Sequence, residues 1–108
     1  NRPDYAWLAH PCDDGFTYTA PAGTFKPNAF GLYDMLGNVA EWVEDCDGAY
    51  KDAPTDGSAA MSNNCEKRIT RGGAWISGPT WVRSAFRHPH PPSYANYAVG
   101  FRIARGLP

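Results

Sequence analysis

Two carboxylates, Asp34 and Glu41, stand on either side of a Gly-Asn turn at residues 37–38. Calcium takes roughly six to eight oxygen ligands at about 2.3–2.6 Å and mixes carboxylates with backbone carbonyls. Because a turn between a short helix and a strand brings such oxygens together, we expect the two carboxylates and the carbonyls of Gly37 and Val39 to bind calcium. The alternative is a helix-end aspartate and a strand glutamate that both face water.

His88 and His90 are the next residues whose type suits a metal ion, because imidazole nitrogens are common ligands of transition metals. The histidines flank Pro89 in a segment rich in proline. We expect the two side chains to lie on opposite sides of an extended loop, so that joint binding of one ion would need a bend at Pro89 and further ligands. Solvated loop histidines and metal ligands are the two interpretations.

Four arginines stand inside apolar motifs instead of on polar stretches. A half-buried guanidinium needs carboxylate or carbonyl partners, so we expect structural ion pairs. The alternative role is to hold an acidic substrate. The arginines are Arg71, Arg83, Arg87 and Arg102, and the nearest candidate carboxylates are Glu41, Glu44 and Asp45.

The elements that position these residues must be short. The chain has 108 residues, enough for one domain, with 11 Gly, 10 Pro and 15 aromatic residues (4 Trp, 6 Tyr and 5 Phe), a composition typical of a loop-rich fold with short strands. A net charge of -1 without a basic run argues against a nucleic-acid partner. No apolar stretch approaches the roughly 20 residues that cross a bilayer, so we expect no membrane insertion.

Hydrophobic periodicity and turn residues divide the chain into alternating loops and short elements. Asn28 is a good N-cap, and apolar residues after it predict a two-turn helix that ends at Gly37. The expected elements are loop over 1–27, helix over 29–36, strand over 39–43, a polar excursion over 44–66, strands over 67–75 and 81–87, loop over 88–92, and a last strand over 99–104.

Four motifs occur in one order along the chain: PNAFGLYDMLGNVAEW at 27–42, RGGAW at 71–75, RSAFR at 83–87 and GFR at 100–102. Together they resemble the C-terminal part of the formylglycine-generating enzyme family, also called sulfatase-modifying factors. The resemblance implies an α+β fold of the irregular C-type-lectin-like kind, with short strands and few short helices. It also implies that residues 1–108 form the C-terminal portion of one domain, whose preceding part is missing or supplied by a second chain.

The resemblance extends to metal ligands. Asp34, Gly37, Val39 and Glu41 match a calcium site of the family residue by residue. A second calcium site of the family matches the Asp14 side chain and the Phe16 carbonyl, with Asn1 and the Arg2 carbonyl as the remaining candidates. An ordinary turn at Asp13-Asp14-Gly15 is the alternative for this second site.

The family's reaction centre is different here. The resemblance implies a copper ion held by two thiolates shortly after the Gly-Gly motif, but these positions fall on Ser77 and on or next to Val82. A hydroxyl and an alkyl group do not bind Cu(I), so we expect calcium as cofactor and no copper. The catalytic residues stay unknown, and candidates for the substrate groove are Trp75, Trp81, Arg87, Tyr94 and Tyr97.

The three cysteines leave one unpaired. Cys46 and Cys65 flank the polar excursion and are placed to form a disulfide; many bacterial members of the family have cysteines in the same place. Cys12 would then be free or bonded to the missing part. A disulfide across a surface loop favours the periplasm or secretion and leaves the cytoplasm as the alternative.

Three interpretations of the function remain. One is an oxidoreductase of altered chemistry, as in family relatives that mature siderophores or sulfur-containing metabolites. Another is a non-catalytic lectin-like module that recognises a protein, a peptide, a small molecule or a glycan. A purely structural subunit is the third and simplest interpretation.

Overall fold

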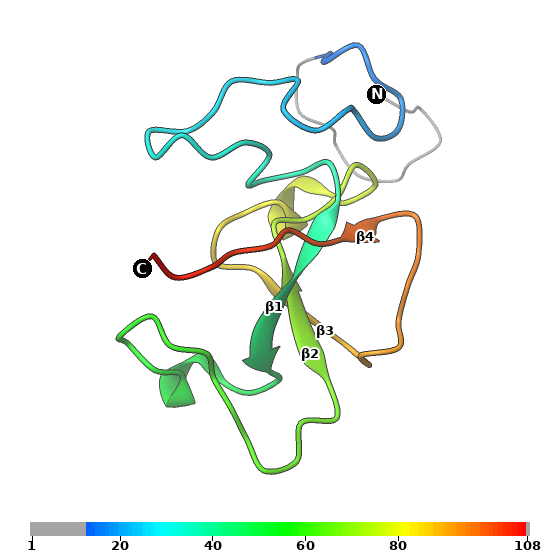
Figure 1. The fold of residues 1–108 in the computed structure, drawn as a ribbon. Helices are drawn as coiled ribbons and strands as arrows, with labels where there is room; N and C mark the ends of the chain where they lie inside the picture. The colour runs from blue at the N-terminus through cyan, green and yellow to red at the C-terminus, as the bar shows by residue number, and fades with distance from the viewer. Residues whose placement is uncertain (1–12, 108) are drawn as a thin grey trace.

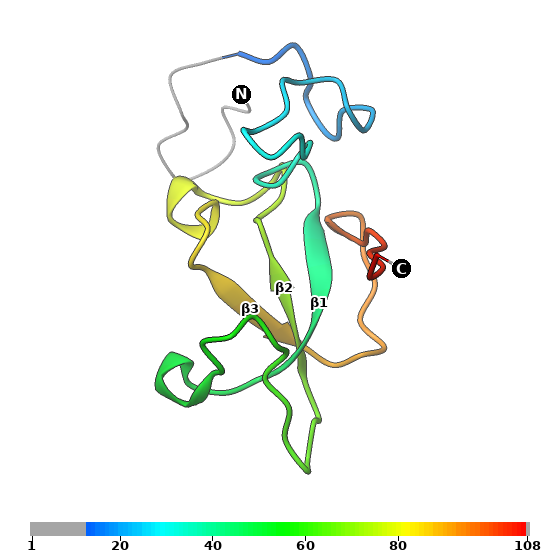
Figure 2. The same cartoon turned by 60° about the vertical axis from the view of Figure 1, so that its left-hand side comes forward.

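A computed structural model describes residues 13–107 of the chain, and a four-stranded sheet forms its centre (Figure 1). The strand order across the sheet is β3-β2-β1-β4. Loops of residues 13–36 lie at one end of the sheet and the 47–66 excursion at the other (Figure 2). The strands are β1 (Ala40–Cys46), β2 (Arg68–Arg71), β3 (Arg87–His90) and β4 (Val99–Gly100), and two 3-10 turns are η1 (Tyr50–Asp52) and η2 (Pro79–Trp81).

The sheet is held mainly by the central antiparallel pair of β1 and β2. Glu41 lies opposite Arg71 and Trp42 opposite Thr70, and an irregularity follows before Cys46 pairs with Arg68. β4 joins the other side of β1 in parallel, so the chain's last motif reaches the strand that carries Glu41. The strand predicted over 39–43 is therefore confirmed and is longer than expected.

Residues 88–90 form strand β3, so the loop predicted over 88–92 is wrong for its first half. Pro89 lies opposite Ile69 in an antiparallel register. Proline is tolerated here because β3 is an edge strand, where alternate backbone groups point away from the neighbouring strand and need no partner in the ladder. The missing N–H of proline excludes Pro89 from an interior strand, but it does not exclude an edge strand.

The helix predicted over 29–36 is absent, and the α part of the α+β prediction is not found in residues 13–107. Gly31 and Asp34 have φ angles of 76° and 54°, which no α-helix accommodates. The Asn28 side chain does bind backbone N–H groups, at Phe30 and Leu32, but the Asn28 N–H returns to the Leu32 carbonyl at 2.9 Å. These bonds close a tight loop where the sequence predicted a capped helix.

Three other boundaries differ from prediction. β2 stops at Arg71 because Gly72 and Gly73 turn with φ angles of 93° and 68°. The strand predicted over 81–87 is replaced by η2 and turns up to Phe86, with β3 beginning at Arg87, and regular pairing of the last strand ends at Gly100. The alternation of apolar residues over 99–104 therefore does not mark a paired strand along its whole length.

The predicted disulfide between Cys46 and Cys65 is present and closes the polar excursion at the end of β1. The Cys46 N–H also donates to the Ala60 carbonyl at 2.7 Å, and the Asp47 N–H donates to the Lys67 carbonyl at 3.0 Å. The excursion is thus tied back to the sheet at its two ends and at Ala60 in between.

The core of the described chain is small. Its fully buried side chains are Ile69 and Thr70 on β2, with Cys46, Ala74 and Ala98 nearly as buried. By contrast Phe30, Ile103 and Leu107 are each about nine-tenths exposed (88%, 90% and 91%). Within residues 13–107, no helix has the length and apolar character needed to cross a membrane.

Candidate functional site

The Gly72–Gly73 turn after β2 forms the frame of the site. The Gly37 N–H donates to the Gly72 carbonyl at 2.7 Å, and the Trp75 N–H donates to the Asn38 carbonyl at 2.8 Å. A Cβ atom on Gly73 would lie 2.7 Å from the Trp81 carbonyl oxygen and 2.8 Å from Val82 Cγ2. Only glycine fits both this left-handed backbone and this contact, which explains the double glycine of the motif.

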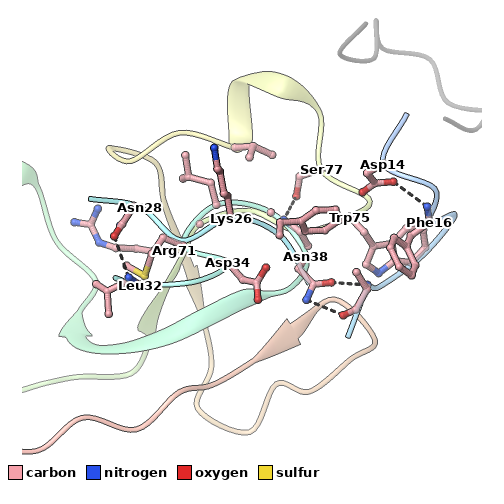
Figure 3. Close-up of a pocket in the computed structure, with 18 of the residues that line it drawn as sticks. Asp14, Phe16, Lys26, Asn28, Leu32, Asp34, Asn38, Arg71, Trp75 and Ser77 are labelled. Carbon is pink, nitrogen blue, oxygen red and sulfur yellow. Dashed lines mark hydrogen bonds between the residues drawn. The ribbon is translucent and has the colours of Figure 1, made fainter. Parts of the chain in front are cut away.

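Asn38 ties the N-terminal loops to this frame. Its Oδ1 accepts from the Ala20 N–H at 2.9 Å, and its Nδ2 donates to the Ala20 carbonyl at 3.1 Å. The same residue has a φ of 63°, a conformation that asparagine adopts more readily than most residues. The two bonds are drawn as dashed lines in Figure 3.

A pocket of about 850 Å³ opens between the N-terminal loops and the turn (Figure 3). Its wall combines aromatic rings with charges of both signs. The Tyr18 ring packs edge-on against Trp75 at 5.0 Å, and the Phe16 ring packs edge-on against Phe25 at 6.0 Å. Such a mixed lining suits an organic ligand with apolar and polar parts. The charged residues that line it are Asp14, Lys26, Asp34 and Arg71.

Ser77 and Val82, on or next to which the resemblance places the family's copper ligands, both line this pocket. The Ser77 hydroxyl accepts from the Ala74 N–H at 2.9 Å, and the Val82 side chain lies beside Gly73. The two side chains therefore flank neighbouring residues of one turn. The sequence indicated Ser77 and Val82 as separate positions, and in the fold both side chains line the same pocket.

The residues present do not fit a Cu(I) ion. Ser77 offers a hydroxyl that already accepts a hydrogen bond, and Val82 offers no donor atom. Cys46 and Cys65, the cysteines among residues 13–107, are joined in the disulfide and do not line the pocket. A soft metal that prefers thiolates has no suitable ligands at these positions.

The bend between Asp34 and Glu41 is closed by Arg102. The Arg102 guanidinium makes a two-bond ion pair with the Glu41 carboxylate and also donates to the Asp34 carbonyl at 3.1 Å. The hydrogen bond to Glu41 raises the pKa of Arg102, so the guanidinium keeps its positive charge at all ordinary pH values. One Asp34 carboxylate oxygen accepts from the Gly23 N–H at 2.8 Å.

This geometry partly fits the calcium ion expected at Asp34, Gly37, Val39 and Glu41. One guanidinium contacts both the Asp34 backbone carbonyl and the Glu41 carboxylate, so the two segments lie side by side, while the Asp34 carboxylate binds the Gly23 N–H. Both Glu41 oxygens, however, already bind Arg102. Calcium would therefore share the Glu41 carboxylate with Arg102, or displace the Arg102 guanidinium from it.

At the second expected calcium site, Asp14 Oδ1 accepts from the Phe16 N–H at 2.9 Å, and Asp13 makes the same kind of bond to Gly15. These are two overlapping turns of the sort in which aspartate binds its own backbone. The other expected ligands, Asn1 and Arg2, lie outside the described residues, as does Cys12.

The five groove candidates are not brought together. Trp75 lines the pocket, and the Tyr97 ring lies against it at 5.7 Å. Trp81, Arg87 and Tyr94 do not line the pocket. Instead, Trp81 and Tyr94 pack against the histidines of β3, and Arg87 lies at a separate cavity of about 500 Å³ beside Tyr50.

The arginines mostly have structural partners. Arg102 pairs with Glu41, while Arg87 contacts Asp45 at 3.8 Å and donates to the Gly48 carbonyl at 2.7 Å. Carbonyls serve the other two, since Arg71 donates to Ser84 and Arg83 to Thr80. Arg71 still lines the pocket, so the alternative role toward an acidic ligand stays open for this residue alone.

Sequence reasoning missed Lys26, Tyr18 and Asn38 as residues of the site. Lys26 and Tyr18 come from the proline-rich start of the chain, where no periodic pattern predicts what a side chain faces. Asn38 was interpreted as part of a helix stop. Its position in a Gly-Asn pair, where a left-handed backbone is favoured, was the available signal.

Similarity to known proteins identifies the family to which the chain belongs. Residues 2–107 match the model of the sulfatase-modifying factor enzyme 1-like domain, and the chain belongs to this family. The family expected from the four motifs is thereby confirmed. Its relatives include the formylglycine-generating enzyme of Mus musculus, which is 30% identical over 95 residues.

Particular relatives span different functions. The chain is 48% identical to PvdO from Pseudomonas aeruginosa, with a TM-score of 0.77 over 82% of this chain and 34% of that structure. It is 38% identical to the serine/threonine-protein kinase pkn1 of Chlamydia caviae over 82% of this chain and 15% of that protein. The mouse enzyme is matched over 85% of this chain and 26% of its own length. The chain thus spans about a third or less of each relative.

Proposed function

We propose that this chain is the C-terminal part of a formylglycine-generating-enzyme-like domain that binds its substrate in the Trp75 pocket and oxidises it by chemistry other than thiolate–copper cysteine oxidation. The observation that carries the proposal is that Ser77 and Val82, at the family's ligand positions, line the pocket without a thiol. The pocket retains the glycine turn and aromatic walls but not the ligands of the metal.

The substrate class follows from the lining. Trp75, Tyr18 and Phe16 favour an aromatic or extended apolar group, while Lys26 and Arg71 can bind a carboxylate and Asp14 and Asp34 can bind an ammonium group. A peptide or a modified amino acid carries both features. We expect the missing part of the domain, or a second chain, to cover the exposed apolar residues and to complete the groove.

Calcium belongs to this proposal as a structural ion at Asp34 and Glu41. The ion would fix the loops that form the pocket's floor, since Asp34 lines the pocket and lies beside Asn38 in Figure 3. Its role would be to position residues, with no part in the oxidation. A periplasmic or secreted location, where calcium is plentiful and disulfides persist, agrees with this expectation.

An oxidation assay with a cysteine peptide tests the part of the proposal that excludes thiolate–copper cysteine oxidation. The purified protein, supplied with copper, oxygen and a reductant, should give no aldehyde on the peptide, whereas a formylglycine-generating enzyme with both cysteines serves as the positive control. Aldehyde formation above the protein-free background would overturn the proposal.

A non-catalytic binding module is the second candidate, and one observation favours it. Tyr97 is 68% exposed and lies against Trp75, so a partner at the 91–98 loop could contact the pocket rim. Oxygen consumption with candidate substrates separates the two, because a binding module consumes none. Loss of partner binding in Tyr97→Ala without loss of folding would support the module.

A further inference from the structure

The edge strand β3 presents two histidines on one face. His88 and His90 are separated by a single residue, and in a strand such residues point to the same side. Their ring centroids lie 4.3 Å apart. The expectation that the two imidazoles point to opposite sides is therefore wrong, and no bend at Pro89 is needed to bring them together.

Aromatic side chains hold both rings in place. The Tyr94 ring stacks on His90 with centroids 4.2 Å apart and an interplanar angle of 3°, and Asn96 fixes the Tyr94 hydroxyl through a 2.6 Å hydrogen bond. Trp81 packs edge-on against His88 at 5.4 Å. These contacts limit the rotamers of both histidines, so little conformational entropy is lost when the rings share a ligand.

The spacing of the two rings also suits a shared metal ion. Two imidazoles on one zinc ion, at metal–nitrogen distances of about 2.0–2.1 Å, bring their rings to within roughly 5 Å of each other, close to the observed spacing.

We propose that His88 and His90 form a two-histidine site for a divalent transition metal ion such as zinc at the edge of the sheet, separate from the Trp75 pocket. Neither histidine lines that pocket. Within residues 13–107 no third histidine, cysteine or carboxylate joins the pair, so water or a ligand group fills the remaining positions. Such an open site suits a metal that binds reversibly.

Zinc titration by calorimetry tests the site on the untagged protein, in buffer with excess calcium so that sites made of oxygen ligands are already filled. We expect one binding event. His88→Asn and His90→Asn should each weaken zinc binding by about tenfold or more, since each removes one of two protein ligands. The matched control is His10→Asn, which removes the third histidine of the chain and should leave the affinity unchanged.

Unchanged affinity in both β3 variants, or an equal loss in His10→Asn, would refute the site. Because a variant can fail to fold, the unmodified protein supplies a second test. In a 1H–15N correlation spectrum of the imidazole nitrogens, zinc should shift the signals of two histidines and leave the third in place. If zinc moves neither His88 nor His90, the proposal is wrong. Calcium or substrate binding at the other site does not affect either outcome.

Discussion

At the scale of single residues, Gly73 allows the turn after β2 to pack closely against η2. A Cβ atom there meets the Trp81 backbone and the Val82 side chain, and the backbone is left-handed. Gly57 has the same kind of backbone with φ 88° but nothing within 4 Å of a built Cβ. Alanine substitutions at Gly57 and Gly73 therefore separate two costs: that of a left-handed backbone at a non-glycine residue, and that of the steric contact with Trp81 and Val82.

We predict that Gly57→Ala lowers the free energy of unfolding by about 1 kcal/mol, the ordinary cost of a left-handed alanine. Gly73→Ala should lower it by roughly 1–3 kcal/mol more, because η2 must move as well. Urea denaturation of both variants measures the difference. Equal losses would mean that the turn and η2 do not make the close contact described above.

His90 carries a pH dependence whose sign follows from its lowered pKa. The folded protein holds the neutral form to lower pH than the unfolded chain does, so the unfolded chain binds the proton first. The contribution of neutral His90 to stability is fully present above the unfolded pKa of about 6.5. It is lost as the pH falls through the lower pKa of the folded state. Denaturation midpoints in metal-free buffer between about pH 7.5 and 5 measure this slope. His90→Asn should flatten it, and an identical slope in the variant would contradict the assignment.

At the scale of elements, the disulfide and the edge strand define how the excursion and the sheet are joined. Cys46 ends β1 and Cys65 comes just before β2, so the bond closes a loop around η1. We predict that the double variant Cys46→Ala/Cys65→Ala loses about 3 kcal/mol of unfolding free energy, the loop-closure value for a ring of this size.

Urea denaturation with and without a reductant checks this loss. The reductant should destabilise the unmodified protein to the level of the double variant and should leave the variant unchanged. A variant as stable as the unmodified protein would show that hydrogen bonds, such as the one from Cys46 to Ala60, suffice to hold the excursion.

The elements also show what a sequence can predict here. The strand over 39–43 and the cysteine placement could be predicted because β1 pairs on both sides, with β2 and with β4, and the disulfide closes the excursion at its end. The segment at 29–36 was misread because Asn28, Gly31 and Asp34 favour turns as strongly as caps. Local bonds of Asn28 close the turn, and distant contacts from Gly23 and Arg102 hold Asp34 in it. β3 was missed since an edge strand tolerates the proline that an interior strand excludes. The pocket required the fold itself, because Lys26, Asn38 and Ser77 are far apart in the chain.

At the scale of the whole molecule, loops with little regular structure are expected to depend on ions and on covering surfaces. We predict that calcium raises the melting temperature of the protein by several degrees at saturating concentration, since an ion that binds only the folded state stabilises it. Glu41→Gln should abolish this calcium-dependent rise. Glu44→Gln, an exposed change on the same strand, is the matched control and should keep it.

Thermal unfolding with calcium or with a chelator measures the rise. Glu41→Gln also weakens the ion pair to Arg102 and lowers the melting temperature without calcium, so the informative quantity is the calcium-dependent difference alone. A rise of the same size in Glu41→Gln would place the ion elsewhere.

The most direct test of the central claim is a Cu(I) titration of the unmodified protein and of the double variant Ser77→Cys/Val82→Cys against a chromophoric chelator. If this pocket is the family's metal position without its sulfur ligands, the double variant should take Cu(I) from the chelator at one equivalent. The unmodified protein should take none at this position. Uptake by the unmodified protein that Ser77→Ala abolishes, or no uptake by a folded double variant, would contradict the account.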